Sequence, residues 1–176
     1  VISANKSYGV NINGSEADSD TVSGNYIGTD AGGTQELGNT LDGVMIADGA
    51  ENNTIGGQAA GERNVIAAST WSGVHINGAS TDGNTVSQNY IGTDVTGTQD
   101  KGNGNDGVRI DGGSHDNTIG PDNLIAHNDQ RGVYVEDSGT TGNTITENSI
   151  HSNGGSYLGI DLYDWGNDEI PAPTVN

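Results

Sequence analysis

DTVSGNYIGTD spans residues 20–30, and it returns almost letter for letter as NTVSQNYIGTD at residues 84–94. A repeat of this length indicates that the chain is built from copies of one structural unit. A unit this small buries too little apolar surface to be stable alone, so the copies must stack on one another. The repeat therefore predicts a solenoid before any single residue is considered.

Shorter signals divide the chain into similar rungs. One is a polar residue, a threonine and a β-branched aliphatic, found at 20–22, 53–55, 84–86, 117–119 and 143–145. The other is a glycine followed by alternating aliphatic residues. It begins at Gly9, Gly43, Gly73, Gly107, Gly132 and Gly159. These glycines are 34, 30, 34, 25 and 27 residues apart, which indicates one coil with loops of variable length.

Alternation of period two, interrupted by Gly, Asn and Asp, is typical of short strands rather than of helices. We therefore expect an all-β fold, a parallel β-helix (β-solenoid) of about six rungs. Its hand is expected to be right-handed, because nearly all crossovers between parallel strands have that hand. Residues 1–176 are predicted to form a single β-helix domain.

Recurring asparagines have a structural explanation within such a fold. Asn tolerates the left-handed backbone of a tight corner, and stacked amides can hydrogen-bond between rungs roughly 4.8 Å apart. We predict one internal ladder from the asparagines that stand two places before an isoleucine. These are Asn25, Asn64, Asn89, Asn123 and Asn148.

The motifs resemble those of a known family. The patterns Asn-Thr-Ile/Val, Asn-x-Ile-Gly-Thr-Asp and Asp-Gly-Val-x-Ile are similar to those of right-handed parallel β-helix repeat proteins of the pectin lyase-like class, bacterial extracellular type. The resemblance covers nearly the whole chain and implies a secreted or cell-surface bacterial protein. It leaves function open, because this fold hosts lyases, hydrolases, epimerases, phage tailspikes, adhesins and spacers.

The charge of the chain argues against two classes of partner. Five basic and 24 acidic residues give a net charge of −19. A potential of this sign repels nucleic acid and anionic lipid headgroups. The sequence also has no apolar run of about 18 residues that would span a membrane. We expect no nucleic-acid partner and no membrane insertion.

Both ends of the chain depart from the repeat. The opening Val1-Ile2-Ser3 looks like the tail of an Asn-Val-Ile-Ser strand, so we expect a fragment of a longer protein with rungs missing before Val1. An open first rung exposes strand edges, which predicts contact with further rungs of the parent chain or self-association. Residues 157–176 are predicted to form a closing rung and a cap, covered by Tyr157, Tyr163, Trp165 and the segment 170–173.

Candidate ligand-binding residues come from strand alternation. In each Gly-Val-x-Ile strand the two aliphatic residues face inward, so the residue between them faces outward. The outward column is Asn11, Met45, His75, Arg109, Tyr134 and Asp161, and the next one is Asn13, Ala47, Asn77, Asp111, Glu136 and Tyr163. Neighbours in a column are expected to lie roughly 5 Å apart. The chemically rich set is His75, Arg109, Asp111, Tyr134, Glu136 and Asp161.

This face allows enzymatic and structural interpretations. A lyase would neutralise a uronate with Arg109 and remove a proton with His75 or Tyr134. A hydrolase would need two carboxylates beside the glycosidic bond. Its candidates are Asp111, Glu136 and Asp161. The structural interpretation is that outward strand positions are ordinarily polar and that Arg109 pairs with its acidic neighbours.

Catalytic motifs of the resembled family are missing from the sequence. Its polygalacturonate hydrolases carry an Asp-Asp pair, Gly-His-Gly and Arg-Ile-Lys, and its mannuronan epimerases carry Asp-Pro-His. Here Arg109-Ile110 is followed by Asp111, and His75 lies between Val74 and Ile76. No catalytic residue is therefore assigned by motif.

Two long loops, residues 28–42 and 92–106, share the pattern Gly-Thr-Asp-x-x-Gly-Thr-Gln-x-x-Gly-Asn-x-x-Asp. Carboxylates, amides and backbone carbonyls are the oxygen ligands that Ca²⁺ takes. Candidate metal ligands are Asp30 with Asp42 and Asp94 with Asp106. The alternative is that Asp and Asn only form the turns. No cofactor is required, and Ca²⁺ is the one that the sequence allows.

These observations predict a rigid structural or adhesive β-helix module that contacts carbohydrate, with a polysaccharide as its candidate partner. The alternative is a polysaccharide-modifying enzyme (a lyase, hydrolase or epimerase) or a catalytically incomplete fragment of one. A groove walled by loops, with the candidate residues converging in it, would favour the enzyme. A flat, hydrated face would favour a spacer.

Overall fold

The computed structural model describes residues 1–59 and 61–168 and contains three parallel sheets. The first sheet holds β1 (Val10–Asn13), β4 (Val44–Ala47), β7 (Val74–Asn77), β10 (Val108–Asp111), β13 (Val133–Glu136) and β16 (Ile160–Tyr163). The second holds β2 (Thr21–Val22), β5 (Thr54–Gly56), β8 (Thr85–Ser87), β11 (Thr118–Ile119) and β14 (Thr144–Ile145). The third holds β3 (Tyr26–Ile27), β6 (Val65–Ile66), β9 (Tyr90–Ile91), β12 (Leu124–Ala126) and β15 (Ser149–His151).

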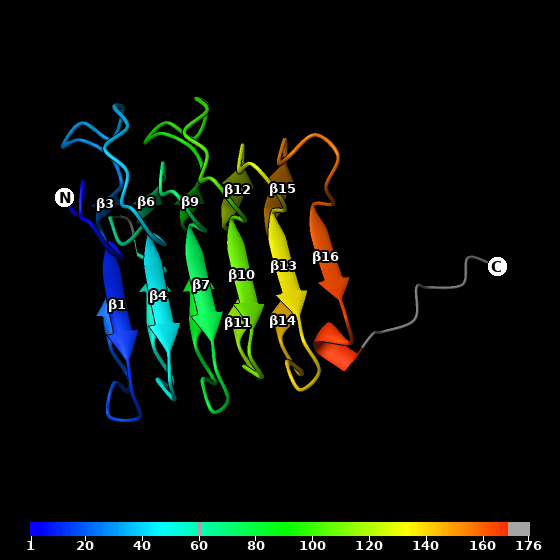
Figure 1. Ribbon diagram of the computed structural model, residues 1–176. Coiled ribbons are helices and arrows are strands. Elements are labelled where there is room, and N and C mark those ends of the chain that lie inside the picture. The colour runs from blue at the N-terminus through cyan, green and yellow to red at the C-terminus, as the bar shows by residue number, and fades with distance from the viewer. Residues whose placement is uncertain (60, 169–176) are drawn as a thin grey trace.

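Each turn of the chain contributes one strand to each sheet, so every strand pairs with the strand three places along (Figure 1). All of these pairings are parallel, and the glycine motif sets their register: Val44 lies beside Val74, and Ile46 beside Ile76. The predicted all-β parallel β-helix of about six rungs is confirmed. The right-handedness of the coil stays a prediction.

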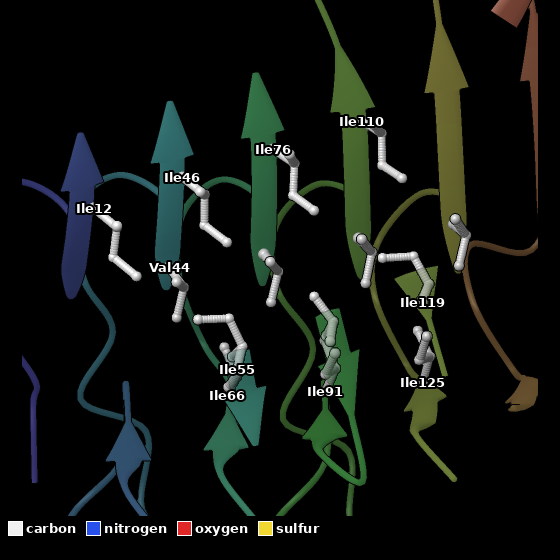
Figure 2. Packing of buried hydrophobic residues seen from close by; sticks show 14 of the residues in the cluster. Ile12, Val44, Ile46, Ile55, Ile66, Ile76, Ile91, Ile110, Ile119 and Ile125 are labelled. Carbon is white, nitrogen blue, oxygen red and sulfur yellow. The ribbon is translucent and has the colours of Figure 1, made fainter. Parts of the chain in front are cut away.

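The interior is a column of aliphatic side chains (Figure 2). Ile46, Ile76 and Ile110 of the first sheet are fully buried, and so are Ile66 and Ile91 of the third. Alternation along each strand turns these residues toward the axis, where the same residue type stacks from rung to rung. No rung could bury these side chains alone, which is why the fold depends on stacking.

The predicted asparagine ladder is confirmed. The Nδ2 of Asn64 donates to the Oδ1 of Asn89 (3.0 Å), Asn89 to Asn123 (3.3 Å) and Asn123 to Asn148 (2.8 Å). The first member, Asn25, joins through its backbone N–H, which donates to the Oδ1 of Asn64 (2.9 Å). This ladder occupies the corner between the second and third sheets.

The other two corners hold ladders that we did not predict. Between the first and second sheets, side-chain amides bond from Asn53 to Asn84 (3.0 Å), to Asn117 (3.0 Å) and to Asn143 (3.1 Å). Between the third and first sheets, the side-chain amide of Asn5 donates to Asn39 (2.9 Å), that of Asn103 to Asn128 (2.8 Å), and that of Asn128 to Asn153 (2.9 Å). Ser69 takes the place of an asparagine in this last ladder, and its N–H donates to the Oδ1 of Asn103.

The long loops begin at two glycines whose backbone requires the absence of a side chain. Gly28 and Gly92 have φ values of 84° and 89°, which favour glycine. A Cβ at either position would also collide with a carbonyl oxygen of the next rung, that of Ala67 or Ala126. These glycines let the chain leave the third sheet while the rungs stay in contact.

At the last rung β16 pairs with β13, and closure of the coil by residues 157–176 stays a prediction. Tyr157, Tyr163 and Trp165 are 48%, 57% and 63% exposed. After β16, the short 3₁₀ helix η1 (Gly166–Asp168) brings in Asn167, whose Oδ1 accepts a bond from the N–H of Asn143 (2.7 Å). Segment 170–173 lies outside the described residues, so the cap stays a prediction.

Within residues 1–59 and 61–168, no helix has the length and apolar character needed to cross a membrane.

Candidate ligand-binding face

The register of the first sheet aligns residues of each predicted column on neighbouring strands. Arg109 lies between His75 and Tyr134, and Tyr134 lies beside Asp161. In the second column Asp111 lies beside Asn77, and Glu136 lies beside Tyr163. The sheet therefore gathers the six predicted ligand-binding residues onto one face of four rungs.

Four of these six residues form one hydrogen-bonded network centred on Asp111. Its Oδ1 lies 3.0 Å from the Nε2 of His75 and accepts a bond from the Nδ2 of Asn77 (2.5 Å). Its Oδ2 accepts a bond from the Nε of Arg109 (2.5 Å). The Nη2 of Arg109 donates to the Oε2 of Glu136 (2.7 Å), so the guanidinium bridges two carboxylates.

The other two predicted residues are organised by Arg131, which we did not predict. Its Nε donates to the Oδ2 of Asp161 (3.1 Å), and its guanidinium lies over the ring of Tyr134, 4.0 Å from the centroid. Arg109 approaches the same ring at 5.3 Å. A cation over a tyrosine face is attracted to it, so the two arginines hold Tyr134 in place.

Asp42, a predicted calcium ligand, also contacts this face. Its Oδ2 lies 3.5 Å from the Nδ1 of His75, and its Oδ1 accepts a bond from the N–H of Ser72 (2.8 Å). His75 is thus held between the carboxylates of Asp42 and Asp111. Burial alone would lower the pKa of His75, but the bonds to these carboxylates outweigh it and raise that pKa to about 9. The imidazole is therefore a cation at neutral pH.

Asp106, the equivalent residue two rungs along, has a different environment. Its Oδ1 accepts a bond from the N–H of Arg131 (3.0 Å), but its buried Oδ2 has no hydrogen-bond partner among the described residues. Burial raises the pKa of Asp106, and the neighbouring cations offset this only in part. A fully buried carboxylate with one unpaired oxygen is costly for the fold.

The other two predicted metal ligands have local partners. The Oδ1 of Asp30 accepts bonds from the N–H groups of Thr34 (2.8 Å) and Gln35 (3.0 Å). Asp94 makes the same turn with the N–H groups of Thr98 (3.1 Å) and Gln99 (3.2 Å). These contacts are those of turn-forming aspartates. No group of three or more His, Cys, Asp or Glu residues is placed to hold a metal within residues 1–59 and 61–168, and Ca²⁺ binding stays a prediction.

A pocket of about 290 Å³ opens beside the charged network. Its lining combines network residues with loop residues: Trp71, Ser72, His75, Asn105, Arg109 and Asp111. Trp71 is 52% exposed, and its carbonyl accepts a bond from the N–H of Asn105 (3.2 Å), so two loops form this wall together. We did not predict Trp71 or Asn105, because they lie in connections of irregular length.

Protonation limits the chemistry of this face. Burial and the Glu136 carboxylate raise the pKa of Tyr134 to about 12. With His75 also protonated, neither predicted lyase base is free to accept a proton at neutral pH. The pKa of Asp111 is held far below its usual value: burial opposes this, but bonds from His75, Asn77 and Arg109 prevail. The face therefore presents fixed charges and hydrogen-bonding groups.

No family model, no curated protein and no solved structure matches this chain. The assignment of a parallel β-helix with asparagine ladders therefore rests on the strand pairing and hydrogen bonds of the structure. Membership of the pectin lyase-like class stays a prediction from the sequence motifs.

Proposed function

We propose that this chain is a rigid adhesive module that contacts carbohydrate through the pocket beside Trp71, in a secreted or surface protein of a bacterium. The pocket is the observation that carries the proposal. It joins a half-exposed tryptophan and an amide, both from loops, to an arginine and a carboxylate from the stacked first sheet. Carbohydrate sites combine these elements, because a sugar has an apolar C–H face and a polar edge of hydroxyl groups.

The scaffold supports this proposal through rigidity. Arg109 is fixed by Asp111 and Glu136, and His75 by Asp42 and Asp111. Binding groups that are already held in place lose little conformational entropy when a ligand arrives. A polysaccharide is a suitable partner, because the Arg109 guanidinium has N–H groups beyond those that bond to Asp111 and Glu136, and these can donate to hydroxyl or carboxylate oxygens.

A second candidate, a polysaccharide-modifying enzyme, is favoured by the convergence of His75, Arg109, Asp111 and Glu136 in one network. The pKa values of His75 and Tyr134 weigh against proton abstraction by either. Incubation with pectate, alginate and neutral glycans, with Ca²⁺ or chelator, separates the candidates. Unsaturated products absorbing in the ultraviolet, or new reducing ends, would establish the enzyme. A bound but unchanged glycan supports the adhesive module.

Affinity electrophoresis or calorimetry with the same glycans tests the binding proposal. Trp71→Ala should weaken binding about tenfold or more, since an aromatic anchor commonly carries much of the binding energy. Trp165→Ala is the matched control, because Trp165 is an exposed tryptophan outside the pocket. Equal loss in both variants, or no loss in Trp71→Ala, would refute the pocket as the site.

A further inference from the structure

The outward face of the third sheet carries a second, unassigned set of binding features. Its register places Tyr26 beside Val65, Val65 beside Tyr90, Tyr90 beside Leu124, and Leu124 beside Ser149. Two hollows of about 250 Å³ and 500 Å³ lie on this face, and Arg63 lines both. The network around Asp111 and the pocket beside Trp71 belong to the first sheet.

Arg63 is held in position with donors left free. Its guanidinium lies over the ring of Tyr90, 4.1 Å from the centroid, and its Nε donates to the carbonyl of Gln88 (3.1 Å). Its two terminal nitrogens donate to no protein atom among the described residues. Among residues 1–59 and 61–168, Arg109 and Arg131 each have carboxylate oxygens within 4.0 Å of the guanidinium, whereas Arg63 has none. A fixed guanidinium with free donors is a ready anchor for a ligand.

The two long loops follow β3 and β9 of this sheet and project from the same end of the coil (Figure 1). They are joined by a bond from the N–H of Val95 to the carbonyl of Gly33 (3.0 Å) and by the ion pair of Lys101 with Glu36 (3.2 Å). Val95 faces Tyr26 and Val65 in the smaller hollow. At Gly97 the second loop packs so closely that a Cβ would lie 3.1 Å from the Tyr90 ring.

The lining of the larger hollow specifies the chemistry of a ligand. Beyond Arg63 it presents Gln88, Asp122, Asn123, Leu124, Glu147 and Ser149. A ligand here must accept hydrogen bonds from the guanidinium and donate them to the Asp122 and Glu147 carboxylates. A hydroxyl group does both. A bare anion would face two carboxylates in a chain of net charge −19, and a cation would face Arg63.

We propose that this face binds a neutral oligosaccharide along the third sheet, with Arg63 as its central anchor. Apolar C–H faces of the sugar would contact Tyr26, Val65 and Val95 in the smaller hollow, and its hydroxyl groups would reach the polar residues of the larger hollow. Rungs are spaced by roughly 4.8 Å, which is comparable with the length of one sugar residue in an extended chain. The site is independent of the function proposed above, because it lies on another sheet and selects a neutral ligand.

Calorimetric titration with cellohexaose, mannohexaose and xylohexaose tests this proposal. At least one should bind, and Arg63→Ala should weaken that binding about tenfold or more, since hydrogen bonds from a charged group are among the stronger ones. Arg63→Lys should retain part of the affinity because it keeps a positive donor. Circular dichroism verifies that each variant folds.

Trp71→Ala separates this proposal from the one for the first sheet. The binding that Arg63→Ala weakens should be unchanged in Trp71→Ala, because Trp71 lines neither hollow of the third sheet. Three results would overturn the proposal: no binding of any of the three at millimolar concentration, full affinity in Arg63→Ala, or loss in Trp71→Ala alone. The last result would assign neutral sugars to the pocket beside Trp71 instead.

Discussion

The corners of the β-helix and the outer face of its first sheet use polar residues in opposite ways. At the corners one residue type, asparagine, repeats from rung to rung, is mostly buried and bonds to its own kind. On the outer face each rung presents a different residue, and His75, Arg109 and Asp111 bond across rungs as unlike partners. At the corners repetition thus marks residues that hold the coil together, and on the outer face of the first sheet departure from repetition marks residues available for a ligand.

The largest expected effect comes from breaking a ladder. Asn89→Ala removes bonds to the carbonyls of Ile55 (2.8 Å) and Ser87 (3.0 Å) and to Asn123 (3.3 Å), and it leaves buried groups unpaired. We expect a loss of roughly 3–5 kcal/mol in the free energy of unfolding, because several buried polar groups lose partners at once. Urea denaturation measures it.

Asn11→Ala is the matched control, because Asn11 is an exposed asparagine on the outer face. Its free energy of unfolding should stay within about 0.5 kcal/mol of the parent. Equal losses in the two variants would mean that the ladder has no special role, which would remove the basis of the comparison.

The next effect is a dependence of stability on pH that comes from the outer face. The pKa of His75 is raised from 6.5 to about 9 in the folded chain. The stabilisation that the charged His75 gives to the folded state is therefore fully present below pH 6.5 and is lost as the pH rises through 9. We expect a loss on the order of 1–3 kcal/mol across this window, since the side chain is only 13% exposed.

Urea denaturation at pH 6, 7.5 and 9.5 would reveal this slope, and His75→Gln should flatten it. A parent curve that stays flat, or a variant that keeps the slope, would show that the two carboxylates do not hold a charged imidazole.

The smallest effect contrasts two carboxylates at equivalent positions. Asp42→Asn removes a charge that faces His75 at 3.5 Å and should cost about 1–2 kcal/mol. Asp106→Asn removes a buried charge with one unpaired oxygen, so we expect stability within about 0.5 kcal/mol of the parent. Thermal unfolding at pH 7 compares the two, and a larger loss in Asp106→Asn would reverse our interpretation.

Local patterns were sufficient to predict the fold. The glycine motif gave the strands and register of the first sheet, and Asn25 to Asn148 gave one ladder, because both depend only on spacing within a rung. The ladder through Asn53 was missed because those asparagines were interpreted only as the start of a strand. The ladder through Asn103 was missed because its members lie in loops of unequal length.

The site was predictable only in part, for a related reason. Strand alternation placed His75, Arg109, Asp111 and Glu136 on one face, and the structure joins them. Residues that enter from turns, such as Trp71 and Arg131, follow no period. Asp42 repeats within the loop motif, which suggested calcium, yet its position just before β4 turns it toward His75.

The most direct test of the carbohydrate-binding face is an NMR titration of the ¹⁵N-labelled chain with the pectate, alginate and neutral glycan panel. A glycan that binds should shift the indole N–H signal of Trp71 and the Nε–H signal of Arg109, while the indole signal of Trp165 stays in place. If no member of the panel moves the Trp71 and Arg109 signals, the pocket beside Trp71 is not a carbohydrate site, and the charged network serves only to stabilise the fold.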